Sequence, residues 1–137
     1  MIRVAIVEDH ELVRLGVRMV LARSRRYTVV AETARGKELE TLVRQCDAQL
    51  VLLDLALSDG AGIAAAARLR QSIPSVKILI VTGDATSSLV KDAFHAGADG
   101  FMLKEGKGEE LLRAMDAVMD GIRYLSPRLG GAGVTPH

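Results

Sequence analysis

Short apolar runs and helical patterns alternate along most of the chain. Runs rich in β-branched residues and leucine predict strands over residues 2–8, 27–34, 49–54, 76–82 and 99–104. The segments that follow them carry apolar residues at a mostly helical spacing, which predicts helices over residues 11–24, 36–46, 61–73, 87–97 and 108–121. The pattern therefore predicts five strand–helix units in succession.

This succession indicates the fold class. Repeated strand–helix units favour a parallel sheet with helices on both faces. The apolar runs 4–7, 50–53 and 78–81 fit strands that are buried on both faces. A chain of 137 residues is long enough for one domain with a single sizeable core. We predict a doubly wound α/β domain.

The last stretch of the chain has a different character. Residues 128–137 read RLGGAGVTPH, a glycine-rich sequence typical of the start of a linker. We therefore expect one domain over residues 1–127, followed by a linker or disordered tail over residues 128–137.

Composition narrows the setting in which the chain works. The formal net charge of +1 gives no general attraction to nucleic acid or anionic membrane. No apolar stretch approaches the about 20 residues of a membrane span, and the start lacks a signal-peptide pattern. The single Cys46 cannot form an internal disulfide. These features predict a soluble, cytoplasmic domain.

Polar residues end four of the five predicted strands. Glu8 and Asp9 end the first, Asp54 the third, Thr82 the fourth and Lys104 the fifth. In a doubly wound sheet, ligands bind outside the carboxyl ends of the strands, where the strand order reverses. If the order is 2-1-3-4-5, these side chains converge on one crevice. That placement explains an ionisable residue directly after an apolar run, since a buried unpaired carboxylate is costly.

Each of these residues also has a purely structural explanation. Asp54 alone can cap a turn, and Glu8–Asp9 can begin a helix, whose amino end favours acids. Thr82 can be a turn hydroxyl and Lys104 a solvated surface lysine. All of these explanations together would require an accidental meeting at one edge, so we favour a shared site.

The residue types at this edge suggest a chemistry. Three carboxylates within several ångströms repel one another unless a cation lies between them. Oxygen ligands suit a hard divalent cation such as Mg²⁺. Lys104 can hold an anion beside the metal, and Thr82 is a hydroxyl donor. These groups are the parts needed for phosphoryl transfer to the carboxylate of Asp54.

Four segments carry a family resemblance. VEDH (7–10), LLDLALSDGAG (52–62), VTG (81–83) and GADGFMLK (97–104) resemble the receiver domain of bacterial two-component response regulators, over residues 2 to 127. The resemblance implies a flavodoxin-like (βα)5 fold with strand order 2-1-3-4-5. EDHELVRLGVRMVL and AVMDGIRYLSPRL resemble most the subgroup whose receivers precede a LuxR-type helix-turn-helix domain, and too few residues follow Pro127 to form that output domain.

The resemblance also implies roles for the strand-end residues. Asp54 would accept a phosphoryl group from a histidine kinase or a small phosphodonor. Asp54, Asp9 and the backbone carbonyl of Ala56 would hold Mg²⁺, with Glu8 acting through water.

The same resemblance implies a switch. Thr82 and Lys104 would contact the phosphoryl oxygens, and Thr82 would move towards them. Phe101 matches the aromatic switch position, where the ring fills the space that Thr82 leaves. Because Phe101 lacks a hydroxyl, its inward state must depend on packing alone, and an ordinary core ring is the alternative reading.

Three positions depart from the family pattern. Ser58 stands where the family usually has proline, and we expect it to loosen the loop without removing a ligand. Ala56 has no side chain that could shield or guide water near the phosphoryl group. Glu105 replaces the common proline after Lys104.

Taken together, the sequence predicts a signalling phosphoacceptor rather than an enzyme, capable only of Mg²⁺-dependent self-phosphorylation and autodephosphorylation. Its expected partners are a sensor histidine kinase, DNA through an output domain outside this chain, and a second copy after phosphorylation; no membrane is involved.

A stand-alone receiver acting through protein–protein contacts is the alternative. A flavin domain fits less well, because Glu8–Asp9 would repel a phosphate, and an aspartate-based phosphatase would need a second aspartate two residues after Asp54.

Overall fold

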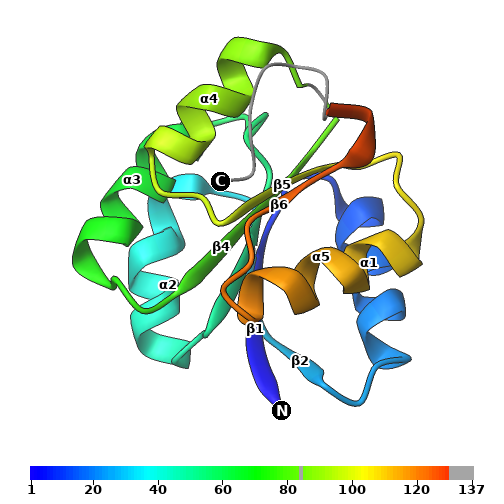
Figure 1. The fold of residues 1–137 in the computed structure, drawn as a ribbon. Helices are drawn as coiled ribbons and strands as arrows, with labels where there is room; N and C mark the ends of the chain where they lie inside the picture. Colours follow the sequence, from blue (N-terminus) through cyan, green and yellow to red (C-terminus); the bar gives the residue numbers. More distant parts are fainter. Residues whose placement is uncertain (84, 130–137) are drawn as a thin grey trace.

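The computed structural model describes residues 1–83 and 85–129, and it contains one parallel sheet (Figure 1). The strands are β1 (Ile2–Val7), β2 (Tyr27–Thr33), β3 (Leu50–Leu53), β4 (Lys77–Thr82), β5 (Gly100–Leu103) and β6 (Tyr124–Leu125). Their order is β2-β1-β3-β4-β5-β6, and every pair is parallel. The predicted order 2-1-3-4-5 is confirmed, and the structure adds a sixth strand.

Helices cover both faces of the sheet. They are α1 (Glu11–Ala22), α2 (Leu39–Cys46), α3 (Gly62–Ser72), α4 (Ser87–His95) and α5 (Gly108–Met119). Helices α1 and α5 pack on one face, and α2, α3 and α4 pack on the other (Figure 1). Short 3₁₀ turns precede α2 (Gly36–Glu38) and follow β6 (Pro127–Leu129). The doubly wound class is therefore confirmed.

The core consists of two apolar layers separated by the sheet. The layer under α2, α3 and α4 contains Leu53, Ile80 and Phe101, and the layer under α1 and α5 contains Leu52 and Leu79. Every residue of β3 is buried, as the uninterrupted apolar run predicts for a central strand with helices on both faces. No described helix is both long and apolar enough to span a membrane.

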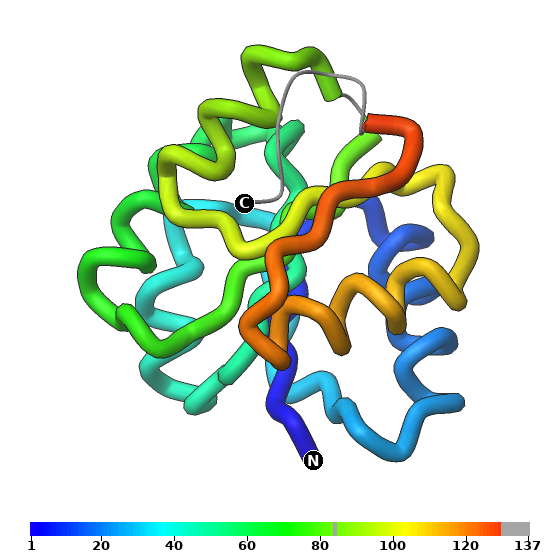
Figure 2. Tube along the Cα trace, viewed as in Figure 1, coloured from blue at the N-terminus to red at the C-terminus, as the bar shows by residue number. Residues whose placement is uncertain are grey.

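Strand β6 is the element that the sequence pattern does not predict. It is only two residues long, too short for an alternating pattern to show. The backbone N–H groups of Tyr124 and Ser126 donate to the carbonyls of Asp99 and Phe101, at 3.2 and 3.0 Å. The chain thus turns back after α5 and runs beside β5, as the orange-red segment in Figure 2 shows. This pairing covers the outer edge of β5.

The end of the described chain packs against the domain. Leu129 is buried and joins the core layer that contains Phe101. Most of the predicted linker, residues 130–137, lies outside the described residues, so the boundary at 127 stays a prediction.

Candidate functional site

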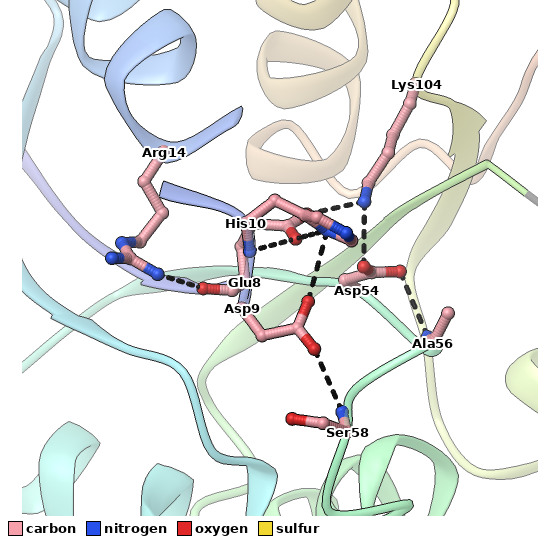
Figure 3. A network of polar contacts seen from close by, with 8 residues as sticks. All are labelled: Glu8, Asp9, His10, Arg14, Asp54, Ala56, Ser58 and Lys104. Carbon is pink, nitrogen blue, oxygen red and sulfur yellow. Dashed lines mark hydrogen bonds and ion pairs between the residues drawn. The ribbon is translucent and has the colours of Figure 1, made fainter. Parts of the chain in front are cut away.

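The polar residues at the strand ends lie together at the C-terminal edge of the sheet. Glu8 and Asp9 follow β1, Asp54 follows β3, Thr82 ends β4 and Lys104 follows β5. Backbone hydrogen bonds continue the sheet past the strand ends, since the N–H of Lys104 donates to the carbonyl of Thr82 at 2.9 Å. Figure 3 shows the acidic side chains and Lys104 turned toward one another. The structure thus brings Glu8, Asp9, Asp54 and Lys104 together, whereas no side-chain hydrogen bond among the described residues links Thr82 to them.

Asp54 is the most enclosed of these carboxylates, with 1% of the residue exposed. Its Oδ1 accepts from the backbone N–H of Ala56 at 3.0 Å, and its Oδ2 accepts from Lys104 Nζ at 2.8 Å. A buried carboxylate is tolerated when it is paired and hydrogen-bonded, and both oxygens here have a donor. Asp54 is therefore a buried carboxylate held in place by two donors, rather than an isolated charge in the core.

Lys104 bridges two of the acids. Its Nζ lies 2.8 Å from Asp54 Oδ2 and 2.7 Å from Glu8 Oε1. Burial lowers the pKa of Lys104, but the hydrogen bonds to Asp54 and Glu8 and their negative charges raise it more, so the net pKa is above its usual value. The ammonium group is protonated at neutral pH and carries its charge into the site.

Glu8 has both carboxylate oxygens engaged. Oε1 pairs with Lys104, and Oε2 accepts from the backbone N–H of His10 at 2.9 Å and lies 2.8 Å from His10 Nδ1. The backbone carbonyl of Glu8 accepts from Arg14 at 2.6 Å, which fixes the start of α1 against the end of β1. Glu8 is thus held by partners from within the protein.

Asp9 differs, because only one of its oxygens is satisfied. Oδ2 accepts from the backbone N–H of Ser58 at 3.0 Å. Oδ1 is shielded from solvent and has no hydrogen-bond partner among the described residues, although His10 Nδ1 lies 3.2 Å away. Burial raises the pKa of Asp9, but the Ser58 bond and the neighbouring His10 lower it more, so the net pKa falls below the usual value. Asp9 is an ionised carboxylate with one free oxygen.

These groups fit a cation. Glu8, Asp9, His10 and Asp54 each offer one ligand atom, and these atoms lie within 4.8 Å of one another. The unpartnered oxygen of Asp9 has the position and charge of a metal ligand, and carboxylate oxygens suit Mg²⁺. The acidic pocket could therefore hold a divalent ion.

The loop after Asp54 supplies two of the donors that orient the acids. Where we expect Ser58 to loosen this loop, the structure has an added tie, because the Ser58 N–H binds Asp9 and proline has no N–H to donate. The loop also passes close to α3. A Cβ on Gly62 would lie 2.8 Å from Leu55 Cα, so only glycine fits there without a shift of the backbone.

Thr82 and Phe101 lie on neighbouring strands and face the same side of the sheet. Phe101 pairs with Ile80, and Thr82 follows Ile80 by two residues, so the side chains of Phe101 and Thr82 share a face. Both residues are fully buried. Thr82 Oγ1 has no hydrogen-bond partner among the described residues, which is costly for a buried hydroxyl.

His10 is the site residue that the sequence reasoning missed. It directly follows Glu8 and Asp9, and this adjacency was the available signal. The sequence alone does not show whether the ring of a histidine next to two acids turns back toward their carboxylates. The structure shows that it does (Figure 3).

Comparison with known proteins identifies the family. The family model described as the response regulator receiver domain matches residues 4–116. The chain belongs to this family. The receiver domain has relatives among curated proteins: it is 33% identical to response regulator GacA of Pseudomonas aeruginosa and 31% identical to the transcriptional regulatory protein DegU of Brevibacillus brevis. These matches cover 94% and 93% of the chain, but only 60% and 54% of the relatives.

Solved structures agree. A two-component response regulator of the LuxR family from Aurantimonas sp. SI85-9A1 superposes with a TM-score of 0.88 at 37% identity, covering 93% of this chain and 91% of that one. Response regulator ChrA of a heme-sensing two-component system gives a TM-score of 0.79 at 30% identity, covering 96% of this chain and 63% of that one. By contrast, the chain spans only 60% and 54% of the length of GacA and DegU.

Proposed function

We propose that Asp54 is the phosphoacceptor of this receiver domain and takes its phosphoryl group from a histidine kinase or a small phosphodonor. The main observation that supports this proposal is the position of the Asp54 carboxylate and its two hydrogen-bond donors. This carboxylate lies at the end of a central strand, between the ammonium group of Lys104 and the N–H of Ala56. Carboxylates held in this way are suitable nucleophiles for phosphoryl transfer.

The transfer itself requires one bond to form and one to break. A carboxylate oxygen of Asp54 bonds to phosphorus, while the bond from phosphorus to the donor's histidine nitrogen or acetate oxygen breaks, and that atom keeps the electron pair. Lys104, already shared between Asp54 and Glu8, lies where it can also pair with a phosphoryl oxygen. Positive charge placed where negative charge accumulates stabilises such a transition state.

The metal of this site is proposed to be Mg²⁺. Asp9, Asp54 and the backbone carbonyl of Ala56 would hold it, and Glu8 would contact it through water, as the family pattern implies. When bound, Mg²⁺ supplies positive charge that offsets the charge of the phosphoryl oxygens.

Thr82 and Phe101 are proposed to read the phosphorylated state. The unpartnered hydroxyl of Thr82 gains an acceptor if it moves towards a phosphoryl oxygen, and an unmet buried hydroxyl costs about 1–3 kcal/mol. Phe101 is already fully buried on the same face, so it can follow Thr82 by repacking without leaving the core. This pair is the proposed two-state element.

The relatives support a proposal about the partners. One relative is a transcriptional regulatory protein and another belongs to the LuxR family, and several are longer than this chain. We propose that the receiver works in the cytoplasm with a sensor histidine kinase, and that it controls a DNA-binding output domain outside the present sequence. Phosphorylation would also promote pairing of two copies.

The test is a measurement of intact mass after incubation with Mg²⁺ and acetyl phosphate. The native chain should gain one phosphoryl group, and Asp54→Asn or removal of Mg²⁺ with a chelator should abolish the gain. Asp59→Asn is the matched control, because Asp59 is in the same loop but accepts from backbone N–H groups, among them those of Lys37 and Ala61, and it should be modified normally. No gain in the native chain, or an equal gain in Asp54→Asn, would refute the proposal.

A further inference from the structure

His10 stands at the rim of the acidic pocket. Its side chain is 65% exposed, whereas those of Glu8 and Asp9 are 5% and 18% exposed. The ring nevertheless turns inward, with Nδ1 2.8 Å from Glu8 Oε2 and 3.2 Å from Asp9 Oδ1 (Figure 3). A histidine that is free to point into solvent instead places a nitrogen among carboxylates.

His10 can donate a hydrogen bond from Nδ1 to Glu8 or to Asp9, but not to both. An ionised carboxylate only accepts, so the short contact with Glu8 requires the proton on Nδ1 to be donated there. That single proton cannot also serve Asp9, and Asp9 Oδ1 therefore has no hydrogen bond although it is shielded from solvent. An unsatisfied carboxylate oxygen next to a ring nitrogen is an arrangement that a cation would complete.

The spacing suits two ligands of one ion. Metal bonds of about 2.0–2.1 Å to histidine nitrogen and carboxylate oxygen place neighbouring ligand atoms roughly 3.0–3.4 Å apart at ordinary bond angles. The 3.2 Å between His10 Nδ1 and Asp9 Oδ1 lies in this range. Asp54 also contributes an atom to the same group, within 4.8 Å of the others.

The nitrogen changes which ions the pocket can select. Mg²⁺ prefers oxygen ligands and keeps several waters, whereas imidazole suits Zn²⁺, Co²⁺, Ni²⁺ and Cu²⁺. Without His10, the described side chains of this cluster would offer only carboxylates as metal ligands. With it, the pocket contains a mixed nitrogen and oxygen donor set.

We propose that His10 gives the pocket a second metal preference, so that Zn²⁺ or Co²⁺ binds through His10 Nδ1 and Asp9 Oδ1 and competes with Mg²⁺. On binding, the ring changes tautomer: solvent takes the proton from Nδ1 and supplies one to Nε2, and the Nδ1 lone pair of the neutral imidazole coordinates the metal. Glu8 Oε2 keeps the backbone N–H of His10 as a donor, so the start of α1 remains anchored. The two ions exclude each other because both use Asp9.

This inference rests on the proposed metal pocket but not on phosphoryl transfer. Its test is isothermal titration calorimetry of the unphosphorylated chain with ZnCl₂ and, separately, with MgCl₂. The variant is His10→Asn, whose amide can still donate to Glu8. The control is His95→Asn, which removes a histidine from the last turn of α4, away from the site.

We expect His10→Asn to weaken Zn²⁺ binding by at least about tenfold and to change Mg²⁺ binding by less than about threefold. His95→Asn should leave both unchanged. In the native chain, added Zn²⁺ should shift the imidazole NMR signals of His10 and leave those of His95 in place. Zn²⁺ affinity that is equal in the native chain and His10→Asn, or shifts confined to other histidines, would overturn the inference.

The outcomes separate this inference from the proposed function. If the native chain is phosphorylated with Mg²⁺ but His10→Asn binds Zn²⁺ normally, only the present inference fails. If Zn²⁺ binds through His10 but no phosphoryl group is gained with Mg²⁺, only the proposed function fails. A competition measurement adds a consequence: Zn²⁺ should lower Mg²⁺-dependent phosphorylation more in the native chain than in His10→Asn, and equal inhibition would count against the shared pocket.

Discussion

At the scale of single residues, the site depends on backbone donors as much as on side chains. Asp54 is oriented by the N–H of Ala56, and Asp9 by the N–H of Ser58, both from the loop between β3 and α3. Neither side chain of the two donor residues is needed for these contacts. The identity of a loop residue therefore matters here mainly through whether it has an N–H.

Ser58 allows this to be tested with two substitutions that both remove the hydroxyl. Ser58→Ala keeps the N–H and Ser58→Pro removes it. A hydrogen bond to a charged group contributes about 1.5–3 kcal/mol, and proline regains about 0.4–1 kcal/mol by restricting the unfolded chain. We expect Ser58→Pro to unfold with a free energy about 1 kcal/mol lower than Ser58→Ala in denaturant titrations without metal. Equal stabilities would show that the bond to Asp9 contributes no more than the about 0.4–1 kcal/mol that proline regains, which is less than expected for a bond to a charged group.

At the scale of elements, β6 and α5 are joined through one carboxylate. Glu110 Oε2 accepts from Tyr124 Oη at 2.7 Å and from Ser126 Oγ at 2.8 Å. Ser126 Oγ in turn accepts from the backbone N–H of Leu103, directly before Lys104. The last strand is thus tied both to α5 and to the strand that leads into the acidic pocket.

This tie predicts an unusual tyrosine titration. The chain has two tyrosines and no tryptophan, so tyrosinate absorbance reports on both residues. Burial raises the pKa of Tyr124, and its bond to Glu110 raises it further; burial and Asp116 do the same for Tyr27. Because the folded pKa values exceed the unfolded value of about 10, stability contributed by these groups is present below pH 10 and is lost as the pH rises beyond it.

The native chain should therefore form tyrosinate at higher pH than the same chain in denaturant. Glu110→Gln should bring one of the two tyrosines closer to its ordinary pKa, since the negative charge on its partner is gone. Glu109→Gln, the exposed neighbour on α5, is the control and should leave the titration unchanged. Coinciding titrations of the native and denatured chains would contradict the buried hydrogen bonds.

The contact between the Asp54 loop and α3 gives a second prediction at this scale. Gly62→Ala places a methyl group 2.8 Å from Leu55 Cα, and the backbone must move, so we expect a loss of about 1–3 kcal/mol in unfolding free energy. Gly16→Ala is the matched control, because a Cβ on Gly16 in α1 meets nothing within 4 Å and should stabilise the helix by about 0.5–1 kcal/mol. Effects of the same sign would contradict the close approach.

At the scale of the whole molecule, the sequence predicts those strands and helices that show a regular spacing of apolar residues. The central strands follow from apolar runs that end in polar residues. The order of the first five strands, and with it the meeting of Glu8, Asp9, Asp54 and Lys104, follows only from the resemblance to receiver domains. Strand β6 is not predictable in this way, because its pairing depends on single contacts such as that between Ser126 and Phe101. The same holds at the site: the direction of one ring decides the place of His10, and no pattern encodes that direction.

The central claim is that a carboxylate held at the end of β3 becomes covalently modified. The most direct measurement traps the acyl phosphate by borohydride reduction after treatment with Mg²⁺ and acetyl phosphate, followed by trypsin and fragmentation of peptide 45–68. This peptide contains Asp47, Asp54 and Asp59, so fragmentation can distinguish the acceptor from two other aspartates. We predict reduction at Asp54 alone. Reduction at Asp47, at Asp59 or only in a different peptide would contradict the account.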